Sequence, residues 1–184
     1  MISAIILPFD LDGEEKRCAE IEWMVRLKPL VDELNAARVM DIVFFHAGDK
    51  DLKSLEWFSG TMIKHDVHTR NIPLGQGLDA LEQKDLHGVM LIPNERLTVS
   101  RDGIIDLLQA YWFSGKRIIV SRFDNKWGYP VIVDITLFDQ LRSLHSLKQV
   151  ARFLEDHQAE VSEVYLESKR EITTSSGHHS EESL

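Results

Sequence analysis

The chain has 184 residues, of which 43% are hydrophobic and 28% are charged, and its formal net charge is −9. This length fits one globular domain with a sizeable core, because two domains would be cramped. The apolar runs fall far short of the roughly twenty residues that span a bilayer, and the first residues lack the pattern of a secretory leader. We therefore expect a cytoplasmic protein without a membrane partner, and the lone Cys18 excludes an internal disulfide.

The charge is unevenly spread along the chain. Residues 155–184 hold eight acidic and two basic residues, so the part that precedes them is close to balanced. Neither part carries the basic stripe with which proteins bind nucleic acid or an anionic membrane surface. The composition therefore predicts no nucleic-acid partner and leaves a small ligand or a protein partner open.

The chain opens with an apolar run from Ile2 to Leu7, which ends abruptly at Pro8. This pattern predicts a buried strand that runs into a loop. In an open α/β sheet, ligands bind outside the carboxyl ends of the strands, so this loop is the first candidate site. It contains one glycine, Gly13, and four acidic residues, followed by the cations Lys16 and Arg17.

Apolar periodicity and breaker residues predict the elements that follow. Further strands are predicted at residues 40–46, 61–67, 89–92, 117–120, 131–133 and 161–166. Helices are predicted at residues 28–38, 51–58, 78–85, 100–114, 137–144 and 147–154. Loops are predicted at residues 71–77 and 124–130. The elements predict one domain over residues 1–170, followed by a polar, disordered tail over residues 171–184.

The predicted helix at residues 100–114 has well-marked ends. Ser100 is a suitable N-cap, and Gly115 is a suitable stop. Its inner face is predicted to carry Ile104, Leu107, Leu108, Tyr111 and Trp112.

The order of the first elements is informative about the fold. A strand, a helix and a second strand fit within about 45 residues, which is the length of a βαβ unit with parallel strands. The sequence therefore predicts an α/β fold with a mainly parallel central sheet.

Two segments carry a resemblance to a known family. Residues 128–138, GYPVIVDITLF, look like a GHPVLFDRALF turn, and residues 27–31, LKPLV, look like a GxPLL helix start. Both motifs are similar to those of the nucleotidyltransferases of molybdenum-cofactor maturation, which attach CMP or GMP to molybdopterin. The resemblance extends over roughly residues 3 to 174. It implies a Rossmann-like three-layer αβα sandwich of the nucleotide-diphospho-sugar transferase type.

The resemblance also implies where a nucleotide binds. The opening loop corresponds to LAAGxSxRMGxxK, which wraps the triphosphate, and implies binding through Leu7, Pro8, Gly13, Lys16 and Arg17. The middle loop is similar to NPxxxxGMxxSL, which lies beside the base and ribose, and implies roles for Asn71 and Gly77.

The metal and acceptor positions follow from two further motifs. Residues 91–100, LIPNERLTVS, resemble LLPGDQPLVS and put Glu95 where the family's aspartate binds Mg²⁺. The acceptor-side turn corresponds to Gly128, Tyr129 and Pro130, with Tyr129 in place of the family's histidine.

Three departures from the motifs affect the chemistry. The family's phosphate-binding Arg and Lys positions fall on Glu14 and near Ala19, and Thr173 stands where a second metal-binding aspartate belongs. A hydroxyl is a poor substitute for a carboxylate on a hard cation. Two hypotheses stay open: a divergent nucleotidyltransferase that binds CTP or GTP with Mg²⁺ and modifies a phosphate-bearing acceptor, and a catalytically inactive descendant that acts as a binding or regulatory module.

Overall fold

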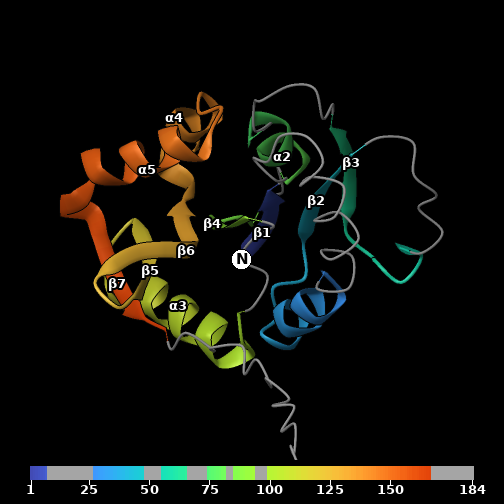
Figure 1. Cartoon of the computed structure of the whole chain (residues 1–184), viewed down its shortest axis with the longest axis horizontal. Helices are drawn as coiled ribbons and strands as arrows, with labels where there is room; N and C mark the ends of the chain where they lie inside the picture. Colours follow the sequence, from blue (N-terminus) through green and yellow to red (C-terminus); the bar gives the residue numbers. More distant parts are fainter. Residues whose placement is uncertain (8–26, 48–54, 66–73, 82–84, 94–98, 167–184) are drawn as a thin grey trace, which may run out of the picture.

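The structure of the chain, a computed structural model, describes residues 1–7, 27–47, 55–65, 74–81, 85–93 and 99–166 (Figure 1). In this part of the chain, the strands form a seven-stranded sheet in the order β3-β2-β1-β4-β6-β5-β7. The strands are β1 (Ile2–Leu7), β2 (Ile42–Ala47), β3 (Thr61–His65), β4 (Gly88–Pro93), β5 (Ile118–Phe123), β6 (Lys126–Asp134) and β7 (Val161–Tyr165). The helices are residues 27–36, α2 (Leu74–Ala80), α3 (Arg101–Phe113), α4 (Phe138–Arg142) and α5 (Leu147–Asp156), with short 3-10 turns at Ile135–Leu137 and Gln158–Glu160.

The sheet is mainly parallel, as predicted. β1 pairs in parallel with β2 and β4, β2 with β3, and β5 with β7. β6 is antiparallel to β5, because a short hairpin connects the two strands directly, and it is also antiparallel to β4. The carboxyl ends of the parallel strands and the start of β6 therefore lie along one side of the sheet, which we call the carboxyl edge. The opposite side is the amino edge.

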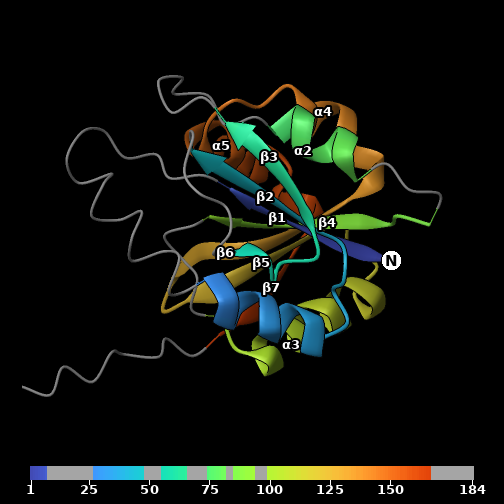
Figure 2. The ribbon, with the colours of Figure 1, turned by 90° about the vertical axis from the view of Figure 1, so that its right-hand side faces the viewer.

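Helices cover both faces of the sheet, as Figure 2 shows. The helix of residues 27–36 and α3 pack on one face, where Leu30 and Leu107 join the alternate strand residues that include Ile6. Helices α2, α4 and α5 pack on the other face, where Leu78 and Phe153 join the set that includes Ile5. Because neighbouring strand residues point to opposite faces, both layers are apolar. The chain is therefore a Rossmann-like three-layer αβα sandwich. The described helices include no segment with the length and hydrophobicity of a membrane span.

Helix α3 has the predicted ends. The Ser100 side chain caps it by accepting a 3.2 Å hydrogen bond from the Gly103 backbone N–H. The helix stops before Gly115, whose φ of +67° lies in the left-handed region that glycine favours. One part of the prediction was wrong: Trp112 is 52% exposed, whereas Ile104, Leu107 and Tyr111 are buried.

The predicted loop at residues 71–77 was wrong in its second half, because α2 begins at Leu74 and ends at Ala80. Two glycines in this stretch suggested a loop, but Gly77 is buried inside the helix. A Cβ at Gly77 would lie 3.0 Å from Ile5 Cδ1 and 3.1 Å from Phe45 Cζ. The glycine therefore allows the helix to approach the sheet closely, and packing against the sheet stabilises the helix despite low intrinsic propensity.

The predicted turn at residues 124–130 was too long. The turn consists of Asp124 and Asn125, and β6 already begins at Lys126. Asp124 has a φ of +52°, which a two-residue hairpin requires and which Asp tolerates. Pro130 is accommodated within β6 because the pairing with β5 shifts register between Val120 and Ser121.

Candidate functional site

The ends of β1 and β4 meet at the carboxyl edge. The two strands pair over six positions, from Ile2 opposite Gly88 to Leu7 opposite Pro93. The Leu7 side chain is fully buried in the core, so only its backbone is available to a ligand. The loop after β1 and the predicted metal segment after β4 therefore start from neighbouring positions.

Six of the predicted site residues lie outside the described part of the chain. They are Pro8, Gly13, Lys16, Arg17, Asn71 and Glu95. Among the described candidates, Gly77 packs against the sheet from within α2, while Gly128, Tyr129 and Pro130 belong to β6. Within the described ranges, no three His, Cys, Asp or Glu side chains are grouped so that they could hold a metal ion.

The predicted acceptor-side turn lies on the same edge as the end of β4. The antiparallel pairing of β4 with β6 reaches Leu91 opposite Val131. Pro93 is two residues beyond Leu91, and Tyr129 is two residues before Val131, so both lie at the carboxyl edge. The peptide bond between Tyr129 and Pro130 is cis. The structure thus brings the predicted acceptor side next to the strand that precedes the predicted metal position.

The backbone of this segment is held by two contacts with β5. The buried Ser121 hydroxyl donates a 2.7 Å hydrogen bond to the carbonyl oxygen of Pro130. At Gly128, a Cβ would lie 2.8 Å from Cδ2 of Phe123, a distance that real Cβ contacts do not reach. The lack of a side chain at Gly128 therefore leaves room for the Phe123 ring, which a larger residue would displace.

The side chain of Tyr129 packs on the face that α5 covers. Its hydroxyl is buried and has no hydrogen-bond partner among the residues that the structure describes. Burial raises the pKa of Tyr129 to about 12, so the hydroxyl stays protonated at neutral pH. The family resemblance marks this position through its Gly-x-Pro motif but gives no role for a tyrosine.

A polar cluster that includes Trp127, on the same face of the sheet as Tyr129, was not predicted from the sequence. At the carboxyl ends of β5 and β7, Arg122 forms a hydrogen-bonded ion pair with Glu163. The indole N–H of Trp127 donates a 2.6 Å hydrogen bond to Glu163 Oε1. The Arg122 guanidinium carbon lies 5.2 Å from the ring centroid of Tyr165. We call these four residues the Arg122 cluster.

The charges in the Arg122 cluster stabilise one another. The hydrogen bonds from Trp127 and Arg122 lower the pKa of Glu163, and the hydrogen bond to Glu163 raises that of Arg122. The pairing of Arg122 with Trp127 could have been predicted from the sequence, because a two-residue turn at Asp124 and Asn125 puts these residues opposite each other. Glu163 is 41 residues from Arg122 in the chain, and only the position of β7 beside β5 brings them together.

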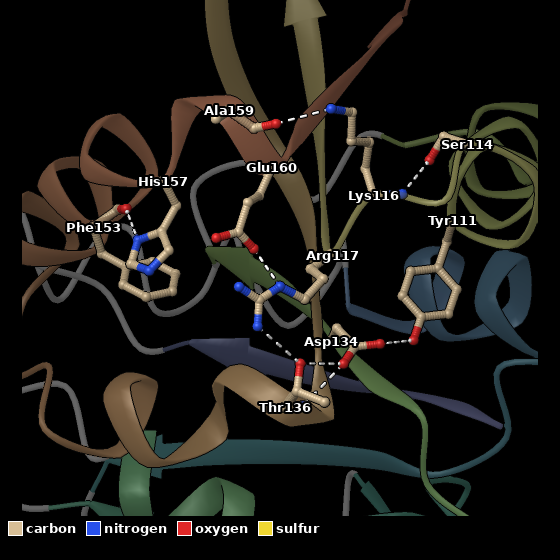
Figure 3. Close-up of polar contacts among 10 residues, drawn as sticks. All are labelled: Tyr111, Ser114, Lys116, Arg117, Asp134, Thr136, Phe153, His157, Ala159 and Glu160. Carbon is tan, nitrogen blue, oxygen red and sulfur yellow. Dashed lines mark hydrogen bonds and ion pairs between the residues drawn. The ribbon is translucent and has the colours of Figure 1, made fainter.

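A second polar network lies at the amino edge, away from the candidate site (Figure 3). The Tyr111 hydroxyl donates a 2.6 Å hydrogen bond to Asp134 Oδ2, and the backbone N–H of Thr136 donates a 2.9 Å bond to Oδ1. Arg117 pairs with Glu160 and also reaches the Thr136 hydroxyl. Burial favours a raised pKa for Asp134, but these hydrogen bonds outweigh it and lower the pKa. Asp134, which matches the aspartate of the family turn, thus has a structural role here.

Comparisons with known proteins identify the fold. Neither the models of known protein families nor the curated proteins include a match to this chain. The solved structure of Rv0371c with manganese from Mycobacterium tuberculosis is similar over 91% of this chain and 88% of its own, with a TM-score of 0.69 and 16% identity.

Two further solved structures are similar over 91% of this chain. A nucleotidyl transferase from Methanothermobacter thermautotrophicus aligns over 88% of its length, with a TM-score of 0.63 and 13% identity. A 4-diphosphocytidyl-2C-methyl-D-erythritol synthase from Anaerococcus prevotii aligns over 89%, with a TM-score of 0.58 and 16% identity. The chain therefore has the fold of the nucleotidyl and nucleotide-diphospho-sugar transferases.

Proposed function

We propose that the chain is a divergent nucleotidyltransferase of the kind that matures molybdenum cofactors. It binds CTP or GTP at the carboxyl edge of β1 and β4 and transfers the nucleotide to a phosphate-bearing acceptor such as molybdopterin. The pairing of Leu7 with Pro93 carries this proposal. It starts the predicted phosphate loop and the predicted metal segment from neighbouring strand ends, which is where open α/β sheets bind ligands.

Each remaining residue of the predicted site has a role in this proposal. The backbone from Leu7 to Gly13, with Lys16 and Arg17, holds the triphosphate. In this proposal Asn71 binds on the base side, Gly77 supports that side by letting α2 pack closely on the sheet, and the segment from Gly128 to Pro130 borders the acceptor.

The proposal includes a divalent cation held by Glu95. Manganese in the similar Rv0371c structure supports a divalent ion at this kind of fold. Such an ion offsets the negative charge of the triphosphate. Glu95 lies outside the described residues, so it is assigned from the sequence motif. We also propose that residues 1–170 form one domain and that the protein is cytoplasmic.

The sequence also supports a second candidate function. Glu14 and Thr173 stand where the family has a phosphate-binding arginine and a metal-binding aspartate. Phosphoryl-type transfer depends on positioning and on charge neutralisation, so losses at both positions favour an inactive descendant that binds a ligand or a partner protein.

A thermal-shift titration tests the first candidate. The full chain is titrated with CTP, GTP, ATP or UTP, each with Mg²⁺ or Mn²⁺. A nucleotide at 100 times its dissociation constant stabilises the fold by about 2.7 kcal/mol, so we expect a clear rise in melting temperature with CTP or GTP. An unmoved midpoint at millimolar nucleotide excludes the enzyme and leaves the second candidate.

The metal assignment is tested by Glu95→Gln. We expect this variant to lose the Mg²⁺ dependence of nucleotide binding. The matched control is Glu155→Gln, which changes an exposed carboxylate of α5 far from β4 in sequence. Unchanged metal dependence in Glu95→Gln rejects the assignment. Pyrophosphate release with molybdopterin as acceptor then separates a working enzyme from a protein that only binds.

A further inference from the structure

Arg122 occupies a position from which it can meet an acceptor substrate. It lies at the carboxyl end of β5, on the edge that carries the candidate site. β6 is the one strand between β4 and β5, so the ends of β4 and β5 are roughly 10 Å apart. This spacing is short enough for one small phosphate-bearing acceptor to extend from the nucleotide site to Arg122.

The guanidinium of Arg122 is held in a fixed orientation. Glu163 binds its Nη1, and the indole of Trp127 holds the other oxygen of the same carboxylate. The ring of Tyr165 lies against the guanidinium. An arginine that is already oriented loses little conformational freedom when it binds a ligand, and its planar fork matches the oxygens of phosphate.

The pairing with Glu163 leaves other N–H donors of the same guanidinium for a ligand. Among the described residues, Glu163 is the hydrogen-bond partner of the Arg122 side chain, and it accepts from Nη1. The Nε–H is buried and has no hydrogen-bond partner within the part of the chain that the structure describes. A buried donor that lacks an acceptor is costly. The side chain as a whole is 24% exposed, so a ligand at the edge can reach part of it.

We propose that Arg122 binds an anionic oxygen of the acceptor, and specifically a phosphate oxygen, while Glu163 acts as a positioning residue that holds the guanidinium. The identity of the ligand as the acceptor rests on the proposed function. The claim that an oriented Arg122 binds phosphate at this edge does not depend on the proposed function. If the pair were only a structural contact between strands, Arg122 and Glu163 substitutions would both lower stability and leave phosphate binding unchanged.

The test uses inorganic phosphate as the probe. The melting temperature of the full chain is followed against phosphate at constant ionic strength, with chloride as the balancing ion. We expect phosphate to stabilise the wild type in a saturable way. In Arg122→Gln, phosphate affinity should be lower than in the wild type by about tenfold or more, since a hydrogen bond to a charged group contributes this much. Arg122→Lys keeps the charge without the planar fork, so its phosphate affinity should lie between those of the wild type and Arg122→Gln. It serves as the second variant if Arg122→Gln does not fold.

Glu163→Gln tests the positioning role. It replaces one of the two carboxylate oxygens that hold Arg122 and Trp127 with an NH2 group, which cannot accept a hydrogen bond, so the guanidinium loses its fixed orientation and phosphate affinity should fall severalfold. The charge-matched control is Arg152→Gln, at an exposed position of α5, which should bind phosphate as the wild type does. The proposal is overturned if phosphate does not stabilise the wild type, if Arg122→Gln and Arg152→Gln weaken phosphate binding equally, or if Glu163→Gln binds phosphate as tightly as the wild type or more tightly.

Nucleotide titration of the same variants separates this inference from the proposed function. Arg122→Gln should keep any stabilisation by CTP or GTP with Mg²⁺, because the nucleotide is proposed to bind at β1 and β4. Phosphate binding through Arg122 without a nucleotide effect leaves an anion site and rejects the transferase. A nucleotide effect without phosphate binding through Arg122 supports the transferase and rejects this acceptor contact.

Discussion

The hydroxyl of Tyr111 in α3 donates a 2.6 Å hydrogen bond to Oδ2 of Asp134 at the end of β6. The hydroxyl oxygen also lies 2.9 Å from the carbonyl oxygen of His87, which immediately precedes β4. One side chain therefore ties a helix to two neighbouring strands at the amino edge. The segment that most resembles the nucleotidyltransferase family, residues 128–138, includes Asp134, so part of its motif supports the fold rather than the chemistry.

Tyr111→Phe removes this tie while keeping the ring. Asp134 then loses a hydrogen bond in a partly buried position, and we expect the free energy of unfolding to fall by about 1–3 kcal/mol. Urea denaturation measures the change. The matched control is Tyr165→Phe, at a residue that is 68% exposed, where the change should stay within about 0.5 kcal/mol. Equal effects in the two variants would show that the Asp134 contact contributes nothing specific.

The lowered pKa of Asp134 predicts an acid-dependent loss of stability. The hydrogen bonds from Tyr111 and Thr136 hold the pKa of this carboxyl below its ordinary value of 3.8, against the opposing effect of burial. A depressed pKa in the folded state gives stability that is fully present above the unfolded-state value and is lost as pH falls through the folded-state value.

We therefore expect the melting temperature to fall as pH drops below about 4, and to fall less steeply in Asp134→Asn. Glu163 also has a lowered pKa, so the variant should keep part of the acid dependence. The control is Asp106→Asn, at an exposed position of α3, which should keep the wild-type profile. A wild-type slope in Asp134→Asn contradicts the argument.

Much of the fold could be predicted because strand and helix patterns depend on local sequence. The apolar run from Ile2 to Leu7 and the capped helix that starts after Ser100 were both recovered. The errors occurred where tertiary packing decides the structure. Gly77 is helical because the sheet lies against it, and β6 extends back to Lys126 because β5 pairs with it.

The sequence predicted which segments of the candidate site follow the strands, at one edge of the sheet, but not which of these segments are neighbours. Sequence indicated that loops follow Leu7 and Ile92, but the pairing of β1 with β4 was needed to show that these strand ends are neighbours. The Arg122 cluster was not predictable in the same way. Its ion pair depends on β7 lying beside β5, a contact between segments distant in the chain.

Two glycines of α2 should respond to alanine with opposite signs. At Gly77, the added Cβ would meet the buried Ile5 and Phe45 side chains at 3.0–3.2 Å, so overpacking should exceed the gain in helix propensity. We expect a net loss of about 1–2 kcal/mol. At Gly75, the nearest atom is the Arg142 carbonyl oxygen at 3.6 Å, and alanine should stabilise the protein by about 0.5–1 kcal/mol. Chemical denaturation measures both, and a stabilised Gly77→Ala would show that the helix can move away from the sheet.

The hydrogen bond between Ser121 and Pro130 fixes the acceptor-side segment, and Ser121→Ala tests its contribution. The hydroxyl is fully buried, and its loss leaves the Pro130 carbonyl oxygen without this donor, so the free energy of unfolding should fall by about 1–2 kcal/mol. The matched control is Ser143→Ala, which removes a 2.7 Å bond from an exposed serine to the Gln140 carbonyl and should change stability little. Stabilisation by CTP or GTP with Mg²⁺ should persist in Ser121→Ala, since β5 and β6 are proposed to form the acceptor side. Loss of the nucleotide effect in this variant, with the fold intact by circular dichroism, would place the nucleotide nearer to β6 than we propose.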